Sequence, residues 1–263
     1  ETVQAPILEA ENLSIQFGGL KALQELSFTI PEKTVFSIIG PNGAGKTTFF
    51  NIVTGIYRPT AGDIRFCGES IVGLEPSRIV ERGICRTFQN IRLFQNLTVL
   101  ENVMIGEHLH YRCGLPDILL RTKRFRAEER ASALRAAEIL DYVGILDDAN
   151  ELAKNLPYGD QRRLEIARAL MTDPKILLLD EPVAGMITTE LEEMAQLVAK
   201  IRKDFNLSII MIEHHMNFVM PIADRIKVVD FGKTISEGTP DVVQKDPKVI
   251  EAYLGGGYQN VNA

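Results

Sequence analysis

Residues 40–48 read Gly40-Pro41-Asn42-Gly43-Ala44-Gly45-Lys46-Thr47-Thr48, and this stretch decides the fold. It fits the pattern G-x-x-x-x-G-K-[ST], in which glycines let backbone N–H groups turn inward around phosphates. Residues 34–39 before it are apolar and rich in β-formers, which predicts a buried strand. Residues 46–53 after it are predicted to form a helix that Gly55 ends. Because a helix start adds a positive dipole end to the loop, the combination predicts a phosphate-binding P-loop.

Each residue type in this loop has a chemical role. Lys46 is expected to reach the β- and γ-phosphates of a nucleoside triphosphate, and Thr47 is expected to ligate Mg²⁺. The other predicted nucleotide-binding residues are Gly40, Asn42, Gly43, Ala44, Gly45 and Thr48. The alternative is a glycine-rich turn with a chance lysine. At a glycine frequency of about 7%, such a match is rare by chance, so nucleotide binding is the favoured interpretation.

Composition describes an ordinary globular protein. The 263 residues suffice for one large domain or two small ones. A net charge of −6 argues against a polyanionic partner such as nucleic acid. Cys67, Cys85 and Cys113 are far apart and odd in number, which predicts a reducing compartment without disulfides or a cysteine metal site. No apolar run is long enough to cross a bilayer, and the first six residues do not resemble a signal peptide.

Hydrophobic patterning predicts an α/β fold with a parallel core sheet around the P-loop, an antiparallel β flap and an inserted helical subdomain. Strands are predicted at residues 7–17, 26–30, 34–39, 64–66, 84–88, 176–181, 207–212, 226–229 and 233–236. Helices are predicted at residues 46–53, 76–82, 127–143, 162–171 and 188–205, with short ones after Thr239 and Asp246. The two strands that precede the loop predict the antiparallel flap.

The pattern changes at Thr98, which is predicted to cap a helix together with Glu101 in a capping box. From there to about Gly144 the pattern is helical. His108 and His110 in this insert face different sides of a helix, so solvated side chains are favoured over metal ligands. We predict one domain over residues 1–263: core and flap at 7–92 and 163–254, helical subdomain at 93–162, flexible tail at 255–263.

The strand at 176–181 ends in two acids, Asp180 and Glu181. Asp180 can hold Mg²⁺ through its water shell, and Glu181 can orient or deprotonate an attacking water. For an isolated motif, a strand followed by a helix-capping acid would be the better interpretation; beside a P-loop, ATP hydrolysis is favoured. Phe17 closes the first strand and can stack on a nucleobase, with a core aromatic as an equally open alternative.

At this point the chain, from residue 8 to 254, resembles the ATPase subunits of ABC transporters, which implies a RecA-like core. Gln89 stands at the family's Q-loop glutamine, His214 at its switch histidine, and residues 185–187 in its D-loop. Residues 156–163 (Leu-Pro-Tyr-Gly-Asp-Gln-Arg-Arg) resemble the LSGGQ signature, which brings Tyr158 and Gly159 to the nucleotide. The resemblance implies the catalytic set Glu181, His214 and Gln89, the metal ligands Thr47, Gln89 and Asp180, and adenine stacking on Phe17.

A narrower resemblance connects the chain to the ATPases of branched-chain amino-acid importers. It rests on residues 17–23, 86–89, 91–94, 158–168 and 238–255. The helical insert at 108–130 resembles the larger of that system's two ATPases. Importers for urea or short amides look similar at this level, so the solute stays open.

The resemblance implies an ATP- and Mg²⁺-dependent subunit, peripheral on the cytoplasmic face of the plasma (inner) membrane. Its implied partners are a second copy or a sister ATPase, integral-membrane permease subunits and, indirectly, a periplasmic or extracellular solute-binding protein. The P-loop of one ATPase subunit would face the signature of the other. The alternatives are an ABC-type ATPase that acts on nucleic acid or ribosomes, and a regulatory subunit that binds nucleotide without turnover.

Four residues depart from the family pattern. Pro157 replaces the signature serine, and Asp160 replaces the usual glutamine. Ile187 stands where a polar D-loop residue is usual, and His215 where an acid usually follows the switch histidine. Asp160 is predicted to be the N-cap of the following helix, because an aspartate suits that position and would repel a phosphate. The departures leave open an altered rate of hydrolysis.

Overall fold

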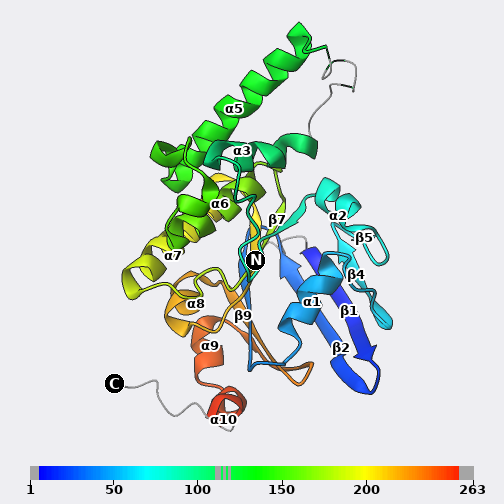
Figure 1. Ribbon diagram of the computed structural model, residues 1–263. Helices are drawn as coiled ribbons and strands as arrows, with labels where there is room; N and C mark the ends of the chain where they lie inside the picture. The colour runs from blue at the N-terminus through cyan, green and yellow to red at the C-terminus, as the bar shows by residue number, and fades with distance from the viewer. Residues whose placement is uncertain (1–5, 110–113, 115–116, 118–119, 255–263) are drawn as a thin grey trace. The chain divides into compact units, whose positions relative to one another are not determined.

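The structure is a computed structural model that describes residues 6–109, 114, 117 and 120–254 (Figure 1). Contacts divide the chain into two compact units, one formed by Glu1–Arg86 with Lys175–Ala263 and the other by Thr87–Pro174. The second unit extends beyond the predicted range of 93–162 at both ends. At the C-terminal end the reason is that helix α6 (Tyr158–Leu170) continues past residue 162 and packs on α3 (Val99–Met104) and α5 (Lys123–Val143).

The first unit contains a six-stranded sheet with the order β10-β9-β3-β8-β7-β6. Its strands are β3 (Val35–Ile39), β6 (Ile84–Arg86), β7 (Ile176–Asp180), β8 (Ser208–Ile212), β9 (Arg225–Asp230) and β10 (Lys233–Gly238). All neighbouring pairs are parallel except β9 with β10. Every residue of β3, β7 and β8 is buried, as expected for parallel strands covered on both faces. The predicted parallel core is confirmed.

A second sheet in this unit is entirely antiparallel, with the order β2-β1-β4-β5, and confirms the predicted flap. Its strands are β1 (Pro6–Phe17), β2 (Leu20–Pro31), β4 (Ala61–Phe66) and β5 (Glu69–Ser70). Strand β2 begins six residues before the predicted start, because Gly18 and Gly19 form a two-residue hairpin loop that pairs Phe17 with Leu20.

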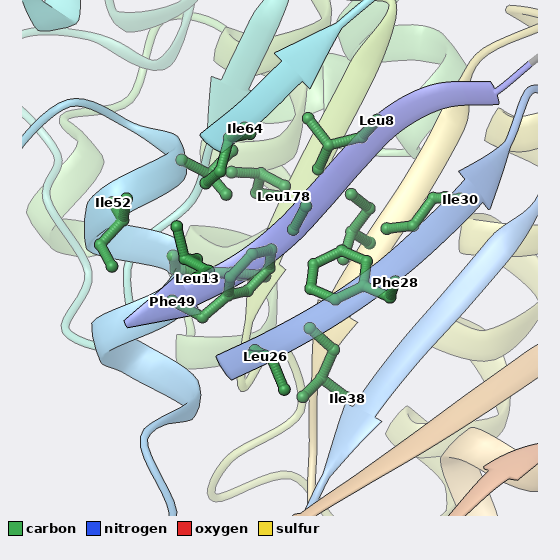
Figure 2. Packing of buried hydrophobic residues seen from close by; sticks show 14 of the residues in the cluster. Leu8, Leu13, Leu26, Phe28, Ile30, Ile38, Phe49, Ile52, Ile64 and Leu178 are labelled. Atoms are coloured by element: carbon green, nitrogen blue, oxygen red, sulfur yellow. The ribbon is translucent and has the colours of Figure 1, made fainter. Parts of the chain in front are cut away.

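Helix α1 (Lys46–Val53) joins the two sheets through one apolar core. Phe49 of α1 meets Phe28 of β2 edge-on, with ring centroids 4.9 Å apart (Figure 2). Ile38 from β3 and Leu178 from β7 belong to the same cluster. Removing the buried ring of Phe49 by substitution with alanine is expected to cost about 3–5 kcal/mol. The helix that carries the end of the P-loop is therefore anchored on its inner face.

The remaining helices of the first unit are α2 (Pro76–Arg82), α7 (Thr188–Asp204), α8 (Met216–Ile222), α9 (Pro240–Gln244) and α10 (Pro247–Leu254). All but α8 lie where the sequence predicts them. Strand β6 ends at Arg86 instead of the predicted Phe88, because the following residues leave the sheet and are held by helix α6 of the second unit.

The second unit is helical, as predicted. Thr98 and Glu101 form the expected capping box at the start of α3, and a 3-10 helix (Ile105–Leu109) follows. Helix α6 begins at Tyr158, four residues before its predicted start, and Pro157 is its N-cap residue. His110, Cys113, the His108 side chain and the predicted tail at 255–263 lie outside the described residues. Among described residues, no helix has the length and hydropathy to span a bilayer.

Candidate nucleotide-binding and catalytic site

The P-loop backbone is shaped by glycines that no other residue could replace. Gly40 and Gly45 have φ angles of 152° and 100°. A Cβ atom on Gly45 would lie 2.5 Å from the carbonyl oxygen of Ala22, and one on Gly40 would lie 1.9 Å from that of Val229. The carbonyl group of Ala44 accepts a hydrogen bond from Gly232 N at 3.0 Å. The loop is therefore fixed by its neighbours, as a cradle of backbone N–H groups requires.

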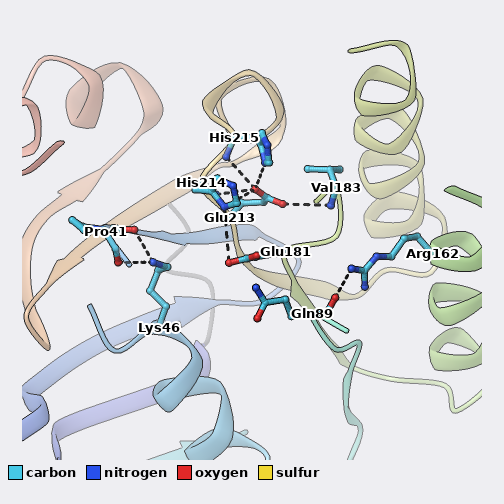
Figure 3. A network of polar contacts seen from close by, with 10 residues as sticks. Pro41, Lys46, Gln89, Arg162, Glu181, Val183, Glu213, His214 and His215 are labelled. Carbon is cyan, nitrogen blue, oxygen red and sulfur yellow. Dashed lines mark hydrogen bonds and ion pairs between the residues drawn. The ribbon is translucent and has the colours of Figure 1, made fainter. Parts of the chain in front are cut away.

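Lys46 begins helix α1 and is buried, with 8% of its surface exposed. Its Nζ donates to the carbonyl oxygens of Gly40 at 2.6 Å and Pro41 at 2.8 Å (Figure 3). Burial lowers the pKa of Lys46, and the nearby carboxylates of Glu181 and Asp180 oppose that shift. The ammonium group is thus held inside the loop and close to the two acids at the end of β7.

Asp180, the last residue of β7, is buried and paired with a cation. Its Oδ2 accepts a hydrogen bond from Arg86 Nη2 at 2.6 Å, and Arg86 Nη1 donates to Asn51 Oδ1 at 2.7 Å. The guanidinium also lies 5.4 Å from the ring centre of Phe50. Sequence reasoning assigned no role to Arg86, because nothing in a linear pattern shows that a cation on β6 meets the end of β7.

The donor set of this unit fits a hard divalent cation. Asp180 offers a carboxylate, and Thr47 is exposed in the first turn of α1. Carboxylate and hydroxyl oxygens are ligands that Mg²⁺ accepts, usually with water completing its shell.

Glu181 and His214 come together at the ends of neighbouring parallel strands, β7 and β8. The Glu181 carboxylate lies 3.9 Å from His214 Nδ1 (Figure 3). Glu181 has a φ angle of 47°, which is uncommon outside glycine, and its N–H donates to Ile212 O at 2.9 Å. Such backbone conformations concentrate at functional sites, where neighbouring contacts hold them in place.

A fully buried carboxylate, Glu213, organises the turn that carries His214. Its Oε2 accepts the backbone N–H groups of His214 and His215 at 2.8 and 3.0 Å, and Nδ1 of His215 lies 2.9 Å from the same oxygen. Its Oε1 accepts the N–H of Val183 at 3.4 Å. Glu213 therefore ties the His214 turn to the segment that follows Glu181. The sequence singled out His215 only as a departure and gave Glu213 no role.

Phe17 lies at the end of β1 with 43% of its surface exposed. Its ring meets that of Tyr57 edge-on, with centroids 5.1 Å apart. The alternative of a core aromatic is therefore wrong, because nearly half of the Phe17 surface is exposed.

The remaining predicted site residues, Gln89, Tyr158 and Gly159, belong to the second unit. Tyr158 and Gly159 form the start of α6, where the first N–H groups of a helix have no partner within the helix. The prediction that Asp160 is an N-cap is wrong. Pro157 occupies that position, so Asp160 lies in the first turn, 3.8 Å from Arg163 Nε. An acid there still interacts favourably with the helix dipole.

Comparisons with known proteins agree with this geometry. The sequence family described as ABC transporter matches residues 23–184, and the family described as branched-chain amino acid ATP-binding cassette transporter matches residues 233–259. The high-affinity branched-chain amino acid transport ATP-binding protein BraF of Pseudomonas aeruginosa is 46% identical over 95% of this chain and 98% of its own length. The corresponding protein LivG of Escherichia coli K12 is 45% identical over the same shares.

A solved structure is similar over the same extent. It is the ADP conformation of an ATP-binding cassette of an ABC transporter, with a TM-score of 0.83 and 33% identity over 96% of this chain and all of that one. The resemblance found in the sequence is thereby confirmed. The chain belongs to the ABC transporter family and is one of its ATP-hydrolysing, ATP-binding cassettes.

Proposed function

We propose that this chain hydrolyses MgATP to power the import of branched-chain amino acids through a separate membrane permease. The observation that carries the proposal is the convergence of three groups in one unit. Lys46 lies on the phosphate loop, where the Glu181 carboxylate opposes the lowering of the Lys46 pKa by burial. Glu181 in turn lies 3.9 Å from His214. Positioning and charge stabilisation, which these groups supply, account for most of the catalysis of phosphoryl transfer.

Each group has a defined task in this proposal. The N–H groups of residues 40–48 and the Lys46 ammonium bind the β- and γ-phosphates, and Phe17 stacks on adenine. Glu181 orients the attacking water and accepts its proton, while His214 contacts the γ-phosphate. Glu213 is a positioning residue that keeps the His214 turn against Glu181.

Mg²⁺ would be held by Thr47, Asp180 and Gln89. When bound, the ion would supply positive charge that offsets the negative charge on the phosphates. Within the protein, Arg86 orients the Asp180 carboxylate by donating to its Oδ2.

The site is completed by a second ATPase subunit, in this proposal. The start of α6, with Tyr158 and Gly159, presents backbone N–H groups and a positive dipole end that suit the outer γ-phosphate oxygens. Pro157 removes only a hydroxyl contact, so these N–H groups carry the interaction. Glu181→Gln should trap an ATP-bound dimer on a sizing column, and Gly159→Asp should abolish that dimer without changing ATP affinity. A Gly159→Asp chain that dimerises normally would contradict the composite site.

The solute and partners follow from the names of the relatives, which are branched-chain amino acid transport ATP-binding proteins. We propose permease subunits, a solute-binding protein outside the membrane, and a peripheral position on the cytoplasmic membrane face. The relatives favour this function over action on nucleic acid or ribosomes. A regulatory subunit that binds nucleotide without turnover would show no ATP hydrolysis. A hydrolysis assay on the purified protein therefore distinguishes it from a transport ATPase.

The proposal is tested by reconstitution. Proteoliposomes that contain the cognate permease and this chain, with the binding protein and ATP on opposite sides, should accumulate leucine, isoleucine or valine. The Lys46→Ala chain should not support uptake. Uptake of urea or a short amide in place of branched-chain amino acids would overturn the solute assignment, and ATP-independent uptake would overturn the energetic role.

A further inference from the structure

The segment that carries Gln89 has no helix or strand between the end of β6 and Thr98. Backbone groups in such a segment need partners other than a sheet ladder. Three buried polar side chains from neighbouring helices supply them: Arg162 and Glu165 of α6, and Asn102 of α3. The position of this segment is therefore set by side chains and not by secondary structure.

Arg162 and Glu165 hold the part of the segment around Gln89. Nη1 of Arg162 donates to Phe88 O at 2.7 Å, and Nη2 donates to the carbonyl oxygen of Gln89 (Figure 3). Glu165 Oε1 accepts the N–H of Arg92 at 2.8 Å, and its Oε2 pairs with Arg162 Nη1 at 3.1 Å. Both side chains are at least 97% buried. One ion pair thus fixes the backbone on both sides of Gln89.

The same guanidinium contacts the first turn of α6. Nη2 of Arg162 donates to the hydroxyl of Tyr158 at 2.9 Å, and the guanidinium lies 5.4 Å from the centre of the Tyr158 ring. One side chain therefore touches both Gln89 and the signature segment.

We infer that Arg162 and Glu165 are positioning residues that hold Gln89 in register with the start of α6, so that the segment around Gln89 and the signature segment keep a fixed spacing. This inference rests on the proposed role of Gln89. Only arginine fits the position, because its planar fork can serve two carbonyl groups and a hydroxyl at once, whereas a lysine offers a single nitrogen. Glu165 is needed because a buried guanidinium requires a counter-charge.

Arg162→Lys in the full chain is the direct test, since it keeps the charge. Arg163→Lys is the matched control, because Arg163 lies next to it on α6 but donates to Val143 O at 3.0 Å. Amide hydrogen exchange should speed up at least about tenfold at residues 88–92 in Arg162→Lys and stay unchanged there in Arg163→Lys. Glu165→Met, which removes the oxygen that accepts the N–H of Arg92, should speed up exchange at Arg92 in the same way. Unchanged exchange at 88–92 in Arg162→Lys would overturn the inference, even if the rate of hydrolysis falls.

A double-variant cycle separates this inference from the role of Gln89 itself. Gln89→Ala alone should slow hydrolysis, and adding Arg162→Lys should slow it by a smaller factor than Arg162→Lys slows the wild type, because the two changes share the contribution of Gln89. Additive losses would show that Arg162 acts elsewhere and would overturn the positioning role. If Gln89→Ala leaves hydrolysis unchanged, the proposed role of Gln89 fails, and the inference fails with it. If Gln89→Ala slows hydrolysis but Arg162→Lys does not, only the inference fails.

Discussion

Arg86 and Asp180 form a buried ion pair in which Nη2 lies 2.6 Å from Oδ2 and neither side chain is more than 5% exposed. The pair joins the end of β6 to the end of β7, and Asn51 Oδ1 adds a contact from helix α1. Asp180 is the proposed metal-binding carboxylate. Its orientation therefore depends on Arg86, which lies neither in the P-loop nor in strand β7.

Arg86→Met should leave Asp180 as an unpaired buried carboxylate and lower the free energy of unfolding by about 3–5 kcal/mol, as measured by urea denaturation. The double variant Arg86→Met with Asp180→Asn should recover most of that loss, since it removes both charges. A double variant that is as unstable as the sum of the single ones would contradict this account of the pair.

Lys46→Ala should weaken ATP binding at least about tenfold in calorimetry, because the charge-assisted contacts to the β- and γ-phosphates are lost. Lys21→Ala is the control, since Lys21 is exposed on β2. Equal affinities for the two variants, both well folded, would exclude the proposed contact.

We expect His215 to affect the rate of hydrolysis through its hydrogen bond to the Glu213 carboxylate, and not because an imidazole ring is required at this position. His215→Ala removes the contact at 2.9 Å and should slow hydrolysis about tenfold, since the His214 turn loses one of its supports. His215→Asn places an amide N–H near the position of Nδ1 and should retain most of the rate. Equal rates for the two variants in a phosphate-release assay would refute this role.

Asp160→Gln should have only a small effect, because Asp160 lies in the first turn of α6 and not at its N-cap. We expect a loss under about 1 kcal/mol that shrinks as salt is added, since the interactions with the helix dipole and with Arg163 are partly exposed. Thr98→Ala removes a true N-cap and should cost about 1 kcal/mol at any salt concentration. A larger, salt-independent loss for Asp160→Gln would restore the N-cap interpretation.

Two glutamates should give opposite pH trends. Burial raises the pKa of Glu165, so its contribution to stability is fully present below the unfolded pKa and is lost as pH rises through the folded pKa. The backbone N–H of Thr98 lowers the pKa of Glu101, so that contribution is present above the unfolded pKa and is lost as pH falls.

Urea denaturation at several acidic pH values checks the two signs. Relative to Glu165→Gln, the wild type should gain stability as pH falls toward about 4, near the unfolded value for glutamate. Relative to Glu101→Gln, the wild type should lose stability only as pH falls further, below that unfolded value. Trends of the same sign would show that the pKa of one of the two glutamates is shifted in the opposite direction.

The sequence predicted those parts of the fold that local chemistry determines. The glycine pattern around Lys46, the capping box at Thr98 and the apolar strands β3, β7 and β8 all lie where expected. The family resemblance named Glu181 and His214, and the structure places them at the ends of β7 and β8, which are parallel neighbours.

The predictions that failed depend on contacts between distant residues. The start of α6 was placed late because Gly159 and Asp160 look like turn residues, yet both are accommodated in a first turn after Pro157. Arg86, Arg162 and Glu213 were missed because their partners lie 94, 73 and 30 residues away. A buried charge is predictable only once its partner in space is known.

The central claim is that this chain hydrolyses ATP with Glu181 as the group that acts on water, and phosphate release from MgATP by the purified protein tests it most directly. The account predicts that Glu181→Gln binds ATP as the wild type does but turns it over at least about 100-fold more slowly, because its amide cannot accept the proton. Glu192→Gln, an exposed change on α7, should keep the wild-type rate. Wild-type turnover by Glu181→Gln would contradict the claim.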